Sequence, residues 1–262
     1  MFNQIMQMLR DCDTENSVLP PTELYNEGWM LRVILNWFSE KKQKQFPLSF
    51  MKDSRWFSEV LLPSQFLPQY RGDPLSENYT HADGAIGKFT IGLSGKGDIN
   101  LSPDLNQLVV IEAKIFSKLS RGVKNAKNFD QVARTVSCIA EILRIKEVPP
   151  DKISHLGFYV LAPSEQIEKE KTFKQYTSKK NIREKVYDRV MAYNEREDKE
   201  SKLDWMYKWF IPTIEQIYIA CISWEDIINY IQTNDNAYGE ELDKFYHGCL
   251  DYNRPMNKKM NG

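Results

Sequence analysis

The chain has 262 residues, of which 42% are hydrophobic and 12% aromatic, and its formal net charge is −1. So many core-forming residues exclude a largely disordered chain, and the balanced charge excludes a domain that is basic over its whole surface. The four cysteines form no C-x-x-C pair, so a structural zinc site is not expected. The N-terminal stretch lacks the apolar core of a secretory signal, and no apolar run is long enough for a membrane span. We therefore expect a soluble, cytoplasmic protein without a membrane contact.

The first regular element expected is a helix over 23–40. Thr22, after two prolines, is a suitable N-cap, and apolar residues follow at helical spacing: Leu24, Leu31, Ile34, Leu35 and Phe38. Residues 47–80 contain Pro47, Pro63, Pro68 and Pro74. This segment is expected to be irregular, with a short helix over 55–62.

A section rich in strands follows. Residues 81–92 alternate enough to form a strand, 94–97 have turn chemistry, and 98–101 predict a short strand. The segment 108–116, LVVIEAKIF, is apolar, β-branched and bounded, and it predicts the strongest strand.

A helix over 129–144 and a buried strand over 155–163 come next. Beyond them we expect mostly helices, one further strand near 214–223 and a helix that starts at 224–226. The fold class is therefore α/β, with the order helix, three strands, helix, strand. We expect 1–163 to form the core and 164–262 a helical C-terminal elaboration packed on it as one domain.

The chemistry centres on Glu112 and Lys114, at the end of the strongest strand. Residues i and i+2 of a strand share a face, so these two side chains project together, while Val109, Ile111 and Ala113 face the other way. Burying a carboxylate and an ammonium is costly without compensation. An E-x-K triplet alone is common by chance, and its meaning depends on its surroundings.

Those surroundings resemble the PD-(D/E)xK nuclease superfamily. Its restriction-endonuclease-like core has the order αβββαβ, with a mixed central sheet flanked by helices, an Asp at the start of one strand and D/E-x-K on the next. The resemblance covers about 22–163 and lies in three segments: THADGAIG (80–87), VVIEAKIFSKLSRG (109–122) and NFDQVARTVSCIAE (128–141).

Two aspartates compete for the first motif. If 98–101 and 108–114 form a simple hairpin, Asp98 lies beside Ile111 and Glu112. Asp83 reaches Glu112 only if its strand pairs directly with 108–116 and 93–106 is an insertion. The THADG context favours Asp83, whereas the register favours Asp98, and both stay open.

The resemblance implies a Mg²⁺ (or Mn²⁺) site made by one of these aspartates, Glu112 and the Ala113 carbonyl, with Lys114 beside the attacking water. Mg²⁺ prefers oxygen ligands and takes only one or two carboxylates. Glu27, on the first predicted helix, is a candidate for completing the metal shell, and Gln131, at the start of the 129–144 helix, for a place beside the site.

A basic loop and helix start follow the strand and are suited to holding phosphates: Lys118, Arg121, Lys124 and Arg134. The expected function is a metal-dependent phosphodiesterase, a nuclease acting on nucleic acid, with DNA as the expected substrate, in restriction, repair or defence. Many such enzymes act as homodimers. The alternative is a catalytically inactive descendant of the fold that binds nucleic acid or a protein partner.

Overall fold

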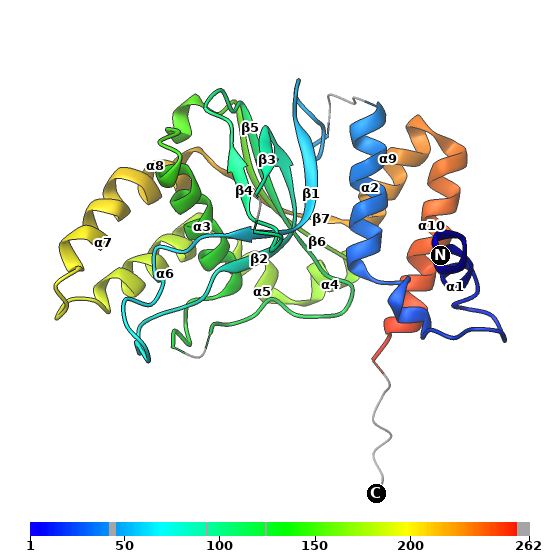
Figure 1. Cartoon of the computed structure of the whole chain (residues 1–262), viewed down its shortest axis with the longest axis horizontal. Coiled ribbons are helices and arrows are strands. Elements are labelled where there is room, and N and C mark those ends of the chain that lie inside the picture. Colours follow the sequence, from blue (N-terminus) through cyan, green and yellow to red (C-terminus); the bar gives the residue numbers. More distant parts are fainter. Residues whose placement is uncertain (42–45, 93, 124, 256–262) are drawn as a thin grey trace, which may run out of the picture.

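The computed structural model of the chain describes residues 1–41, 46–92, 94–123 and 125–255. It is an α/β protein in which a sheet lies between two groups of helices (Figure 1). None of the described helices combines the length and the apolar character that crossing a membrane requires.

The central sheet is mixed and has five strands in the order β1-β2-β5-β6-β7. Strands β1, β2 and β5 are antiparallel neighbours, whereas β5, β6 and β7 run parallel. The bounds are Arg55–Leu62 for β1, Thr80–Gly87 for β2, Gln107–Ala113 for β5, His155–Ala162 for β6 and Tyr218–Ser223 for β7.

All seven residues of β5 are buried, because helices cover both faces of the sheet. One face packs on α3 (Gln131–Ile145), and the other on α2 (Glu27–Lys41), α9 (Trp224–Asn234) and α10 (Asn236–Asn253) (Figure 1). Val109, Ile111 and Ala113 belong to the α2 face, as their alternation predicted. The predicted helices at 23–40 and 129–144 and the strand at 155–163 are confirmed with small shifts of their ends.

Residues 55–62 form strand β1, so the prediction of a short helix there was wrong. An eight-residue segment with mixed apolar spacing fits either structure locally. Pairing decides the outcome, because β1 is in register with β2 from Arg55 opposite Gly87 to Leu62 opposite Thr80.

A separate hairpin lies between β2 and β5. It consists of β3 (Phe89–Ile91) and β4 (Ile99–Leu101), which pair with each other and form a small second sheet. The expected single strand over 81–92 is therefore divided at Lys88, and β4 does not pair with β5. The turn of this hairpin lies against β1, where the Leu61 N–H donates to the Gly97 carbonyl at 2.8 Å.

The region after β6 is mostly helical. Strand β7 is the one strand that the structure describes there, and it joins the sheet beside β6. The predicted strand near 214–223 is confirmed over Tyr218–Ser223, whereas 214–216 belong to helix α8, and the following helix is confirmed. The remaining elements have the following bounds: α1 Phe2–Arg10, η1 Pro21–Glu23, η2 Pro150–Lys152, α4 Ser164–Lys169, α5 Lys171–Tyr176, α6 Lys179–Met191, α7 Lys199–Trp205, η3 Met206–Phe210 and α8 Ile211–Gln216.

Candidate active site

The carboxylates of Asp83 and Glu112 meet where β2 and β5 separate. The last ladder pair of these strands is Gly84 opposite Ile111. One step beyond it, the Asp83 side chain takes the place of a backbone partner, because its Oδ2 accepts from the Ala113 N–H at 2.6 Å. The N–H and C=O of one strand residue point to the same side, so the Ala113 carbonyl also faces this gap.

Glu112 is almost completely buried, with 3% of its surface exposed. Its Oε1 accepts from the Lys114 ammonium and from the Gln131 side-chain amide. Lys114 is itself buried, so this ion pair is shielded from solvent. A buried pair of this kind holds its geometry well, since breaking it leaves an unpaired charge in the interior.

The two carboxyl groups are electrostatically linked. Burial, together with the neighbouring Asp83 charge, raises the pKa of Glu112 to about 7, although Lys114 and Gln131 act in the opposite direction. Burial also raises the pKa of Asp83, against the effect of the Ala113 N–H and of Lys114. Two acids in one low-dielectric hollow favour a proton or a cation between them.

The backbone at Lys114 is fixed on both sides. Its N–H donates to the Leu161 carbonyl of β6 at 2.8 Å, and its carbonyl accepts from the Trp224 indole at 2.8 Å. The ammonium is thereby directed from a rigid point just beyond β5, which is what a precisely placed catalytic cation requires.

Gln131 is the first residue of α3, where Asp130 caps the helix by accepting from the Ala133 N–H at 2.9 Å. The Ser120 N–H donates to the Gln131 side-chain oxygen at 3.1 Å, and the Gln131 N–H donates to the Ser120 carbonyl at 2.9 Å. Because the amide oxygen is already used as an acceptor, the amide nitrogen is left to donate to Glu112.

The donor set suits Mg²⁺ in kind, since two carboxylates lie together and the Ala113 carbonyl faces the same gap by strand geometry. Across the described ranges, however, no group of three or more His, Cys, Asp or Glu side chains is placed to hold a metal ion. Asp83 and Glu112 are therefore a two-carboxylate site.

Two of the predicted ligands lie elsewhere. Asp98 is in the β3–β4 turn, where its carboxylate accepts from the Ser94 hydroxyl and packs against Gly92. The register argument for Asp98 was wrong, because β2 and not β4 is the neighbour of β5. Glu27 begins α2, where its charge adds to the effect of burial in raising the pKa of Cys249 on α10. It does not join the two carboxylates in a metal cluster within the described part of the chain.

The four predicted phosphate-binding residues have different surroundings. Lys118 is exposed and pairs with Glu170 at 2.7 Å, and Arg121 is exposed on the same loop. Arg134 is half-buried on α3, and its charge acts against the rise that burial causes in the pKa of Glu77. Lys124 lies outside the described residues.

Glu59 was not found from the sequence. It lies on β1 with a left-handed backbone (φ 57°), its charge raises the pKa of Asp83, and its carboxylate pairs with Arg32 at 3.3 Å. The sequence carried no signal for it, because the segment around it was expected to be a helix, which would turn Glu59 away from any neighbouring strand.

Comparison of the chain with protein-family models, with curated proteins and with solved structures finds no match in any of the three.

Proposed function

We propose that this chain is a divalent-metal-dependent nuclease that hydrolyses phosphodiester bonds, with Asp83, Glu112 and Lys114 at its centre. The observation that carries the proposal is the convergence of the two carboxylates from neighbouring strands, with the Lys114 ammonium in contact with one of them. The αβββαβ order of α2, β1, β2, β5, α3 and β6 supports a restriction-endonuclease-like core.

Phosphodiester hydrolysis needs a nucleophilic water and stabilisation of the charge that develops on the phosphate. Bound Mg²⁺ supplies Lewis acidity and lowers the pKa of water. Asp83, Glu112 and the Ala113 carbonyl would hold the ion. Lys114 would orient the water and offset the new negative charge, and Gln131 would keep the Glu112 carboxylate in place. The expected substrate is DNA.

A cleavage assay with Mg²⁺ on labelled DNA and RNA tests the proposal. Asp83→Asn and Lys114→Met are each expected to lower the cleavage rate by at least about a hundredfold, as the loss of a metal ligand or of a transition-state charge does. Asp98→Asn is the matched control, because Asp98 carries the same group outside the site, and it should keep the wild-type rate. Circular dichroism must show that all three variants remain folded.

Equal cleavage by Asp83→Asn and the Asp98→Asn control would refute the proposal. A second candidate function is favoured by one observation. Lys114 already neutralises Glu112 in a buried ion pair, which leaves less negative charge to attract a cation. On this alternative the chain binds nucleic acid or a protein partner without cutting. Absence of cleavage by the wild type together with retained binding of nucleic acid supports it.

A further inference from the structure

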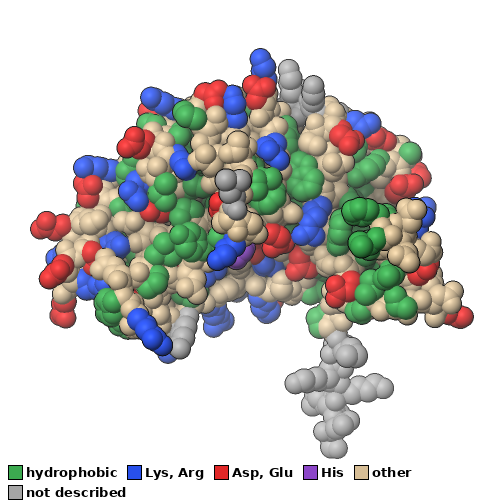
Figure 2. Space-filling view, in the orientation of Figure 1, with side chains coloured by type: hydrophobic (Ala, Val, Ile, Leu, Met, Phe, Trp, Pro, Cys, Tyr) green, Lys and Arg blue, Asp and Glu red, His purple; other side chains and the backbone are tan. Residues whose placement is uncertain are grey.

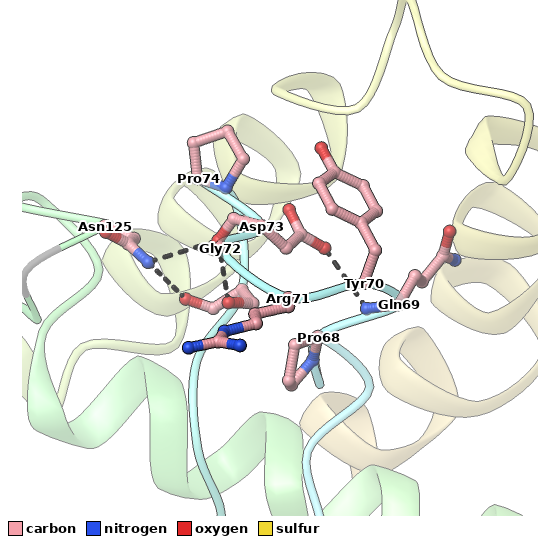
Figure 3. Close-up of a pocket in the computed structure, with 9 residues that line it drawn as sticks. Pro68, Gln69, Tyr70, Arg71, Gly72, Asp73, Pro74 and Asn125 are labelled. Carbon is pink, nitrogen blue, oxygen red and sulfur yellow. Dashed lines mark hydrogen bonds between the residues drawn. The ribbon is translucent and has the colours of Figure 1, made fainter.

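Two adjoining hollows lie beside the start of α3. The first, about 580 Å³, is open to solvent and lined mainly by the 68–76 loop, and the second, about 220 Å³, lies between the 125–129 segment and α6. Asn125 lines both, and its amide donates to the Ser76 carbonyl at 3.0 Å (Figure 3). We call the two hollows together the side groove.

The side groove is linked to the candidate active site by a series of side-chain contacts. Lys185, which lines the second hollow, pairs with Asp130. Asp130 caps α3 directly before Gln131, whose amide donates to Glu112. The second hollow is therefore joined by side-chain contacts to Gln131, the residue whose amide donates to Glu112.

The groove carries cations without carboxylate partners. Within the described ranges, Arg71, Lys127 and Arg189 form no ion pair. Two carboxylates offset part of this charge: Asp188 lines the second hollow, and Arg189 is near enough to Glu77 to act against the rise that burial causes in the pKa of that carboxyl. Asp73, in the first hollow, is already neutralised by Arg196 at 2.7 Å. Lys and Arg side chains also gather along the lower edge of the molecule in Figure 2, on the side of α5 and α6.

Arg189 differs from the other two cations in being buried, with 5% of its surface exposed. One end of its guanidinium donates to the Leu75 carbonyl, and its plane lies 4.8 Å from the ring centroid of Phe66. Its Nε is buried without a hydrogen-bond partner. A buried cation with an unused donor is costly, and an anion in the adjoining hollow would relieve that cost.

The first hollow also offers an aromatic surface. Tyr70 is 56% exposed, and the Arg196 guanidinium lies 5.5 Å from its ring centroid. Arg71 leaves the same loop in a different direction from the Tyr70 ring (Figure 3). An exposed ring next to an unpaired cation is the combination that holds a base by stacking and its phosphate by charge.

We propose that the side groove holds an unpaired strand of nucleic acid that leads to the Glu112 site, with Tyr70 stacking on a base and Arg71, Lys127 and Arg189 facing phosphates. This inference rests on the proposed function, and it specifies the substrate as one with a single-stranded segment. A base inside a duplex is already stacked and paired, so the Tyr70 ring selects for an unpaired base.

The test measures binding without cutting. Fluorescence anisotropy of wild type in EDTA is expected to give tighter binding to a single-stranded oligonucleotide than to the same sequence as a blunt duplex. Tyr70→Ala/Arg71→Ala should weaken binding of the single strand about tenfold or more, and should lower the slope of log affinity against log salt by about 0.7 for the lost phosphate contact. The matched control, Tyr207→Ala/Arg55→Ala, removes an exposed tyrosine and an exposed arginine outside the groove and should leave both unchanged.

Equal affinity of the two double variants, tighter binding of the duplex, or no binding of either oligonucleotide would overturn the inference. The Mg²⁺ cleavage assay is scored separately. If the wild type cleaves but Tyr70→Ala/Arg71→Ala does not weaken binding, the groove inference is refuted and the nuclease proposal stands. If Tyr70→Ala/Arg71→Ala weakens binding but the wild type does not cleave, the nuclease proposal is refuted and the groove remains a binding site.

Discussion

Replacing Glu112 by Gln tests the electrostatics of the site directly, because glutamine keeps the shape of the side chain and removes its charge. The folded-state pKa of Glu112 is about 7, whereas its ordinary value is 4.5, and the first cause is burial. As pH rises from 4.5 to about 7, the carboxyl of residue 112 loses its proton in the unfolded chain before it does so in the folded one. The wild type therefore becomes less stable against unfolding as pH rises. The loss from this group is at most about 3 kcal/mol, and it is complete above the folded-state pKa.

The assay is urea denaturation at several values between pH 5 and pH 8 in EDTA, for wild type and for Glu112→Gln. Glutamine leaves Lys114 without its anion, and this destabilises the variant by the same amount at every pH. The test therefore compares how the free energy of unfolding changes with pH in the two proteins, and not its absolute value. The free-energy difference between the two proteins should shift in favour of Glu112→Gln by about 2 to 3 kcal/mol across the window. Glu184→Gln, at an exposed helix position, is the control. Parallel pH profiles for wild type and Glu112→Gln would refute the argument that the Glu112 charge is held at a cost.

Further predictions follow from neighbouring contacts. A few millimolar Mg²⁺ should raise the melting temperature of wild type more at pH 8 than at pH 6, because the ion needs the ionised form of Glu112, and it should have no such effect on Asp83→Asn. Gln131→Ala should raise the pKa of Glu112 further by removing a donor to its carboxylate, and should cost about 1 kcal/mol in urea denaturation. Gly97→Ala should destabilise by at least about 2 kcal/mol, because a Cβ there would lie 2.2 Å from the Glu59 carbonyl at a φ of +87°. Gly95→Ala, at a φ of +70° with open space around it, should destabilise by only about 1 kcal/mol. Equal destabilisation by the two substitutions in thermal melts would contradict the clash of a Cβ at residue 97 with the Glu59 carbonyl.

Local patterns predicted the elements whose apolar spacing is unambiguous. The alternation around Glu112 placed Val109, Ile111 and Ala113 on one face, and the structure has them there. Gln131 was placed at the start of its helix, and the Asp130 cap fixes that start. These features depend on neighbours within a few residues, so the sequence contains them.

Pairing between distant segments could not be predicted in the same way. Strand β1 depends on eight residues meeting β2, and no local signal separates it from a short helix. That one error had two consequences. It hid Glu59, and it left 98–101 as the apparent third strand of the sheet, which kept Asp98 as a rival to Asp83.

The choice between the two aspartates follows from how the sheet is filled. A hairpin of 98–101 with 108–114 would occupy the edge of β5 that faces away from β6. Because β2 occupies that edge, the two short strands β3 and β4 pair with each other and fold back on β1. The ladder between β2 and β5 ends at the pair of Gly84 and Ile111, which leaves the Ala113 N–H free for a side chain, and the Asp83 carboxylate accepts from it. The acidic pair thus arises from the end of a ladder, where a backbone N–H without a strand partner donates to a side chain instead, and this is why the two carboxylates meet at this point in the fold and not at the hairpin turn.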